Sequence, residues 1–145
     1  MKKKLIIIFF FSTLFIFQSF NLDSDPSFIS TWGTMMDEGF WQHNARMKII
    51  YGEYSYDDFN IAYLGAPLFN NVLYLFYKTF GISLKSARGV SLLAFWLILI
   101  MMYLILNDKF GENKTMVIVL FFGIFHELLN YVKWSTPILL EMCFL

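Results

Sequence analysis

Charged side chains are scarce in this chain, since Asp, Glu, Lys and Arg make up only 15% of its 145 residues. Soluble domains average about 25%, so the chain has too few charges to cover the surface of a soluble domain. Hydrophobic residues account for 58% and aromatic residues for 21%. The formal net charge is zero and no basic run follows the first four residues. Nucleic acid is therefore not an expected partner.

Several chemical signatures are also missing. Cys143 is the only cysteine, which excludes an internal disulfide and says nothing about the compartment. The sequence has no Gly-rich phosphate loop, no Cys/His metal cluster and no serine nucleophile elbow. These absences argue against the common soluble enzyme classes. The composition instead favours a helical membrane protein.

Three apolar segments predict membrane spans. Residues 5–20 follow Lys2–Lys4 and predict a retained anchor with its lysines in the cytoplasm. A cleaved signal peptide is the alternative, although the chain offers no small-x-small cleavage motif after this run. Residues 87–106 predict a second span and residues 116–130 a third.

The apolar run at residues 137–145 is too short for a span. Its nine residues would form a helix of only about 14 Å. We therefore expect a fourth span that is cut short, as in a fragment of a longer protein. Counting spans from the first lysines puts residues 21–86 outside the membrane and the loop 107–115 in the cytoplasm.

Residues 21–86 differ from the spans in charge and pattern. Seven of the eleven acidic residues lie between positions 21 and 66, against only Arg46 and Lys48. Within this loop, Glu38–Tyr51 predicts an amphipathic helix that lies along the membrane surface. Its apolar face carries Phe40, Met47 and Tyr51, and its opposite face carries Glu38, Gln42 and Arg46.

Pro67–Phe80 predicts a second interfacial helix, because its 14 residues fall short of the roughly 20 that a span needs. If this segment crossed instead, everything after it would be inverted, and Lys85 with Arg88 would favour that version. The predicted fold is an all-α membrane protein of the cytoplasmic (inner) membrane. It is a multi-pass helical bundle of three spans plus a truncated fourth, with two interfacial helices in the first extracytoplasmic loop.

The adjacent carboxylates Asp37 and Glu38 are the leading candidates for catalytic groups. A carboxylate beside a bilayer has a raised pKa and becomes a better proton acceptor near neutral pH. The alternative is that a helix amino terminus simply favours acidic residues. Arg46, about 80° around the helix from Glu38, is a candidate to orient that carboxylate or to bind phosphate.

Three further residues are candidates for substrate binding. Asp57 and Asp58 are candidates to bind a metal ion or a donor group, and a plain polar turn is the alternative. His43 near the edge of the helix is either a ligand or an interfacial side chain. No metal site is assigned, and the cofactor stays open, with a divalent cation as one candidate.

A series of short motifs resembles a known family when taken in order. The sequence contains Asp37-Glu38-Gly39-Phe40, Ala45-Arg46, Gly52-Glu53-Tyr54, Pro67 at the start of an aromatic helix, Phe80-Gly81-Ile82-Ser83 and Ala87-Arg88-Gly89-Val90-Ser91. This succession resembles the amino-terminal part of the GT-C type integral membrane glycosyltransferases. That family includes the protein O-mannosyltransferases and the lipid A aminoarabinose transferases.

The resemblance implies a polyprenyl-phosphate sugar donor, a lipid, glycan or protein acceptor, and contact with membrane lipids. It also implies that Asp37 is the catalytic base or the group that orients the acceptor. Two positions depart from the family: Ala66 precedes Pro67 where some relatives carry a basic residue, and 133–137 lacks an acidic residue found in others. The alternative function is a small non-enzymatic multi-pass membrane protein, either a transporter piece or an assembly partner.

Overall fold

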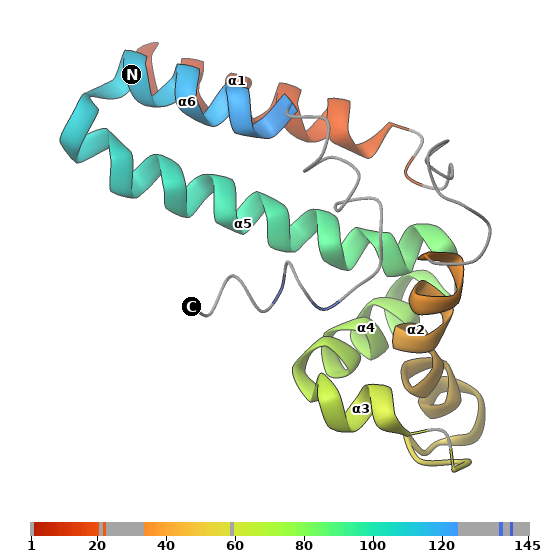
Figure 1. Cartoon of the computed structure of the whole chain (residues 1–145). Coiled ribbons are helices and arrows are strands. Elements are labelled where there is room, and N and C mark those ends of the chain that lie inside the picture. Colours follow the sequence, from red (N-terminus) through yellow and green to blue (C-terminus); the bar gives the residue numbers. More distant parts are fainter. Residues whose placement is uncertain are drawn as a thin grey trace.

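The computed structural model describes residues 2–20, 22, 34–58, 60–124, 137 and 140, and every regular element among them is an α-helix (Figure 1). The all-α prediction is therefore confirmed for this part of the chain. The helices are α1 (Lys2–Ser19), α2 (Thr34–Tyr51), α3 (Ile61–Gly65), α4 (Pro67–Phe80), α5 (Leu84–Phe110) and α6 (Glu112–Ile124).

Local sequence signals explain where α4 and α5 begin and end. Pro67 occupies the first turn of α4, where its missing N–H costs no helical hydrogen bond. Gly81 and Gly111 follow the two helices with φ of 82° and 75°, a conformation that glycine adopts without steric cost. Ser83 caps α5, because its Oγ accepts a hydrogen bond from the Ser86 amide at 3.1 Å.

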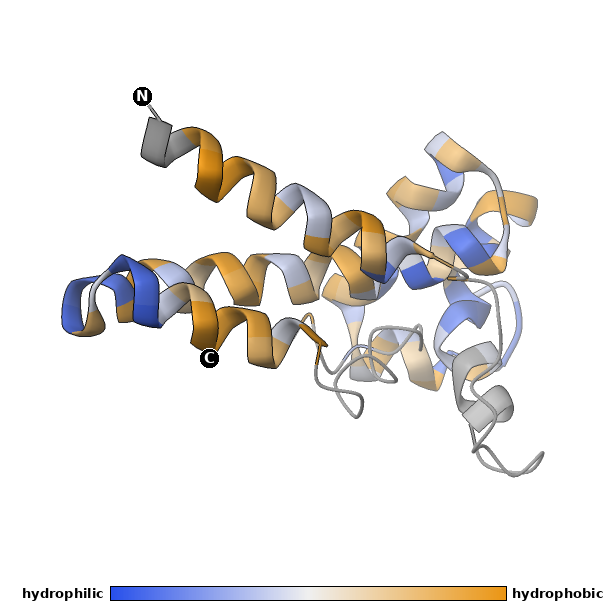
Figure 2. Ribbon diagram, turned by 90° about the horizontal axis from the view of Figure 1, so that it is seen from above, coloured by the Kyte–Doolittle hydropathy of each residue, from blue (hydrophilic) through white to orange (hydrophobic). Residues whose placement is uncertain are grey.

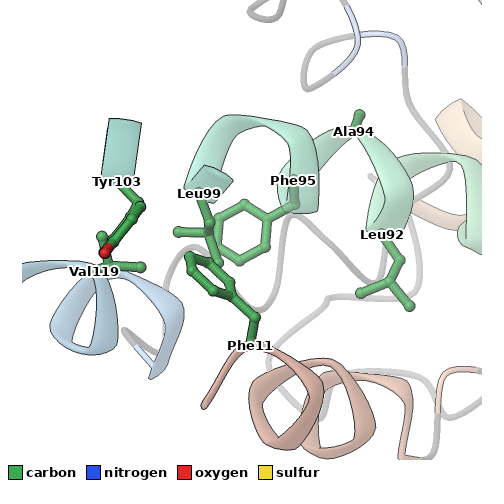
Figure 3. Close-up of a cluster of buried hydrophobic side chains, with 7 residues drawn as sticks. All are labelled: Phe11, Leu92, Ala94, Phe95, Leu99, Tyr103 and Val119. Carbon is green, nitrogen blue, oxygen red and sulfur yellow. The ribbon is translucent and has the colours of Figure 1, made fainter. Parts of the chain in front are cut away.

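Helices α1, α5 and α6 run side by side and are called the bundle here (Figures 1 and 2). Their shared core is apolar and draws on all three helices. Phe11 of α1 reaches toward Phe95 and Leu99 of α5, as Figure 3 shows. Phe11 also meets Tyr103 edge to face, with ring centroids 5.6 Å apart. Among the described residues, the buried members of this core are Phe11, Leu92, Ala94, Phe95, Leu99, Tyr103 and Val119.

Helices α2, α3 and α4 pack together at the amino end of α5, and we call them the α2–α4 unit. A second apolar core joins them to the first turns of α5. It comprises Ala45, Ala66, Phe69, Leu73, Tyr77, Ala87 and Val90. Helix α5 therefore belongs to both cores and fixes the unit relative to the bundle.

Among the described residues, α5 is the one helix that is long and apolar enough to cross a membrane. It has 27 residues, or about 40 Å of helix. Helix α1 contains a shorter apolar stretch, Leu5–Ser19. The predicted span 116–130 is described only as far as Ile124, and the predicted truncated span 137–145 lies outside the described residues apart from Pro137 and Leu140. One candidate span thus stands where the sequence suggested three.

The predicted surface helix exists as α2, but its packing differs from the expectation. Gln42 was assigned to the face opposite the apolar one, yet it is only 7% exposed. Its Oε1 accepts a hydrogen bond from Tyr77 Oη of α4 at 2.9 Å. Small Ala45 on the same side is completely buried. Helix α2 therefore packs its mixed polar side on α4 and does not stand alone on a surface.

Candidate functional site

The acidic pair lies near the start of α2. The helix begins at Thr34, so Asp37 is its fourth residue and Glu38 its fifth. The helix dipole favours negative charge in this part of a helix. The side chains of Asp37 and Glu38 lie outside the described part of the structure. Their predicted catalytic role therefore stays a prediction.

The structure brings His43 and Asp57 together. His43 Nε2 lies 2.9 Å from Asp57 Oδ2 and 3.2 Å from Oδ1. The His43 side chain is 20% exposed and that of Asp57 is 41% exposed. Since His43 is six residues after Asp37, the two positions differ by about 9 Å along the helix axis. The loop after α2 thus returns one candidate carboxylate toward the helix that carries the acidic pair.

Asn44 fixes the path of this loop. It is completely buried, its Nδ2 donates to the Tyr54 carbonyl at 2.8 Å, and its Oδ1 accepts from the Tyr63 amide at 3.0 Å. These two bonds satisfy backbone groups on both sides of the loop. A third contact runs from Lys48 Nζ to the Gly52 carbonyl at 2.6 Å. The segment from Gly52 to Asp58 is therefore held against α2 by side chains of α2 itself.

Tyr54 links the loop to α4. Its ring stacks on that of Tyr63 with centroids 4.5 Å apart, and its Oη donates to Asn71 Oδ1 at 2.8 Å. Burial raises the pKa of Tyr54, and the neighbouring Tyr63 and Tyr74 phenols add to the shift. The phenol therefore stays protonated at neutral pH and keeps its role as a hydrogen-bond donor.

Arg46 is the candidate to orient Glu38 or to bind phosphate, and this role stays a prediction because the Glu38 side chain lies outside the described part of the structure. Its Nη2 makes a long contact with the Gly39 carbonyl at 3.5 Å. Its Nε is buried and has no hydrogen-bond partner in the described part of the chain. Asp58 follows Asp57 in the loop and is exposed. The structure thus groups His43 with Asp57, leaves Asp58 at the surface beside them, and turns Arg46 toward its own helix.

Two polar residues with defined roles were missed as site candidates. Arg88 is only 1% exposed, and its Nη1 donates to the Leu22 carbonyl at 3.1 Å. A cation at the start of an apolar helix is itself a signal, because ionisable groups there are costly and usually functional. Asn44 gave a weaker signal, since asparagine is a poor residue for a helix interior unless its side chain has a specific partner.

Taken together, the arrangement presents an imidazole of α2 paired with a carboxylate of the loop that follows, on the same helix that carries the acidic pair near its start. In the described residues, no three His, Cys, Asp or Glu side chains gather in a group that could hold a metal ion. No family model, curated protein or solved structure matches the chain.

Proposed function

We propose that the chain is the amino-terminal part of an integral membrane glycosyltransferase. In this proposal it transfers a sugar from a polyprenyl-phosphate donor to an extracytoplasmic lipid, glycan or protein acceptor. One observation carries the proposal: the helix that contains Asp37 and Glu38 in its first turns is packed on α4, which in turn packs on α5. A catalytic group on a helix fixed in this way keeps its position relative to the candidate span.

The proposed reaction forms one bond and breaks another at the anomeric carbon. The acceptor hydroxyl oxygen bonds to that carbon while its bond to the donor phosphate oxygen breaks. The hydroxyl proton goes to the Asp37 carboxylate, and the electron pair of the broken bond leaves with the polyprenyl phosphate. Guanidinium groups bind phosphate well, so Arg46 on the same helix is the candidate that meets the leaving group.

The proposed location is the cytoplasmic membrane, with several spans. Helix α5 supports this by its length and apolar composition. Helices α1 and α6 lie beside it, and their outward positions include large exposed apolar side chains such as Phe9, Val117 and Phe121. In a bilayer these side chains would face lipid, and the α2–α4 unit would lie at the outer surface. A divalent cation stays open as a cofactor.

The test is a transfer assay on the full-length protein in liposomes that contain radiolabelled polyprenyl-phosphate mannose or polyprenyl-phosphate aminoarabinose. Removing the proton acceptor with Asp37→Asn should lower the transfer rate by about 10²-fold or more. The matched control is Asp108→Asn, which removes an exposed carboxylate from the other end of α5. Full activity of Asp37→Asn would exclude Asp37 from catalysis, and no transfer by the wild type from either donor would reject the proposed activity.

The second candidate is a non-enzymatic multi-pass membrane protein that assembles with a partner. The exposed apolar face of α6, with Val117, Phe121 and Ile124, favours it, because such a face can cover another membrane helix as well as lipid. Under this hypothesis the wild-type protein transfers no sugar from either donor. Instead, Phe121→Ala would weaken its assembly into a larger complex in native gels.

A further inference from the structure

Two half-exposed tyrosine rings stack face to face at the carboxyl end of α2. Tyr51 is the last residue of the helix, and Tyr56 lies in the loop that follows. Their rings stack with centroids 3.7 Å apart and an angle of only 7° between the ring planes. Tyr51 is 51% exposed and Tyr56 is 54% exposed. Because each ring covers one face of the other, the pair can offer a ligand only its outward ring faces and its edges.

The loop that carries Tyr56 is held in one place. Asp57, the next residue, is paired with His43 at 2.9 Å. Tyr54, two residues earlier, is fixed through its carbonyl by Asn44. The ring of Tyr56 is therefore positioned by contacts on both sides of it. A surface that is fixed before a ligand arrives loses less entropy on binding.

The position of the loop indicates whether the tyrosine pair meets membrane lipid or a water-soluble ligand. Figure 1 shows the loop after α2 at the part of the α2–α4 unit farthest from α1 and α6. Tyrosines often lie at membrane interfaces, but this pair lies away from the apolar bundle. The neighbouring side chains Glu53, Asp57 and Asp58 are exposed carboxylates. An acidic surface of this kind suits water and a hydroxyl-rich ligand better than a bilayer with anionic lipids.

We propose that Tyr51 and Tyr56 form a binding platform for a hexopyranose ring, and that this ring belongs to the glycan of the acceptor. The C–H face of a pyranose ring packs on a flat aromatic surface. Its hydroxyl groups donate hydrogen bonds to carboxylates, and the candidates are the exposed Glu53 and Asp58, which follow Tyr51 and Tyr56 by two residues each. The assignment to the acceptor rests on the proposed glycosyltransferase function, whereas the sugar binding itself does not.

The shape of the pair separates a sugar from a cation, the other ligand that carboxylates and aromatic rings attract. Cages for quaternary ammonium groups surround the cation with several ring faces. Tyr51 and Tyr56 instead lie parallel, with 7° between their planes, and offer a flat surface without a facing wall. The geometry therefore favours a flat ring as the ligand.

The experiment is saturation-transfer NMR on the full chain in lipid nanodiscs, with mannotriose, cellotriose, chitotriose and tetramethylammonium as separate probes and no donor lipid present. At least one trisaccharide should bind, with transfer to its ring C–H protons. Tyr56→Leu should weaken that binding by about tenfold through loss of the stacked surface, and Asp58→Asn should weaken it by a few-fold. Phe80→Leu is the control, because Phe80 is a 68% exposed aromatic residue at the end of α4.

Three outcomes would overturn the platform. The protein could bind tetramethylammonium alone, it could bind none of the trisaccharides, or Tyr56→Leu could bind the sugar as well as the control variant Phe80→Leu does. Sugar binding is measured without donor lipid, so its outcome is separate from the outcome of the transfer assay. Sugar binding by a wild-type protein that transfers nothing would reject the transferase and keep the platform. Transfer that is unaffected by Tyr56→Leu would reject the assignment of the platform to the acceptor and keep the transferase.

Discussion

The bundle and the α2–α4 unit are stabilised by different kinds of contact. In the bundle, the core is formed by aromatic and aliphatic side chains. A hydrogen bond from Gln18 of α1 to the Gly123 carbonyl of α6, at 2.8 Å, joins two of its helices. The unit also has an apolar core. It adds a set of polar contacts centred on Asn44, on the Gln42–Tyr77 pair and on His43 with Asp57.

This difference bears on function. Apolar contacts are not directional, so they hold helices together without setting the position of individual atoms closely. Hydrogen bonds from buried side chains to backbone groups fix specific atoms. Among the described residues, the unit with the candidate catalytic and binding residues makes more of these bonds than the bundle does. We infer that the bundle serves as the support and the α2–α4 unit as the working region.

The largest effect should come from a charge on the outer face of the bundle. Leu97 lies at the middle of α5 and is 45% exposed. If that face meets lipid, Leu97→Lys should cost about 2.5–3.5 kcal/mol of membrane insertion. A glycosylation-mapping insertion assay measures this cost directly. The matched change in the unit is Ile50→Lys, since Ile50 is 55% exposed near the end of α2.

The comparison of the two lysine variants tests the division of the molecule. Ile50→Lys should be within about 0.5 kcal/mol of the wild type, as is usual for surface substitutions in water. Equal costs at positions 97 and 50 would show that the outer face of α5 does not meet lipid. A high cost at position 50 alone would reverse the assignment of the two regions.

The next largest loss of stability is expected from a substitution of Asn44, the residue that fixes the loop after α2. Asn44→Ala removes both of its bonds and leaves the Tyr54 carbonyl and the Tyr63 amide without that partner. The expected cost is about 2 kcal/mol of unfolding free energy, with faster amide hydrogen exchange at Tyr63. Asn113→Ala at an exposed position of α6 is the control. Unchanged exchange at Tyr63 would show that other contacts hold the loop.

Parts of the fold follow from local sequence signals. The second surface helix was predicted with the bounds that α4 has, because Pro67 and Gly81 mark both ends chemically. Helix α2 ends at Tyr51 as predicted, and Gly52 follows it with φ of 87°. The span predicted over 87–106 is shorter than α5, because a helix continues beyond its apolar residues until Gly111 breaks it. Helix α3 was not predicted, since its five residues carry no periodic pattern.

The contacts within the site were harder to predict from the sequence. Asp57 and His43 were both candidates, yet nothing in the sequence paired them across the loop. Their meeting depends on the turn at Gly52 and on Asn44, which acts through backbone groups that no residue pattern reveals. The packing face of α2 was predicted wrongly, because periodicity assigned Gln42 to the polar side and gave no sign of its partner Tyr77. A polar residue on a helix face predicts an exposed side chain only when no neighbouring element offers that side chain a hydrogen-bond partner.

The smallest and most selective effect should come from two glutamines, one in each region. Gln42 Oε1 accepts the hydrogen bond of Tyr77 Oη, and both side chains are buried. Gln42→Leu should therefore cost about 1–2 kcal/mol, since it leaves a buried hydroxyl without that acceptor. Gln18 is equally buried, but its Oε1 has no hydrogen-bond partner in the described part of the chain. Gln18→Leu removes that unsatisfied oxygen together with one bond to Gly123, so its net effect should be close to zero.

Denaturant titration of both variants in mixed micelles measures their free energies of unfolding under the same conditions. The double variant Gln42→Leu with Tyr77→Phe supplies the internal check. It removes the hydroxyl that loses its Gln42 acceptor in Gln42→Leu, so it should recover part of the lost stability. If Gln18→Leu costs as much as Gln42→Leu, polar contacts matter equally in both regions. The division between an apolar support and a hydrogen-bonded working region would then be wrong, whatever the chemistry at Asp37.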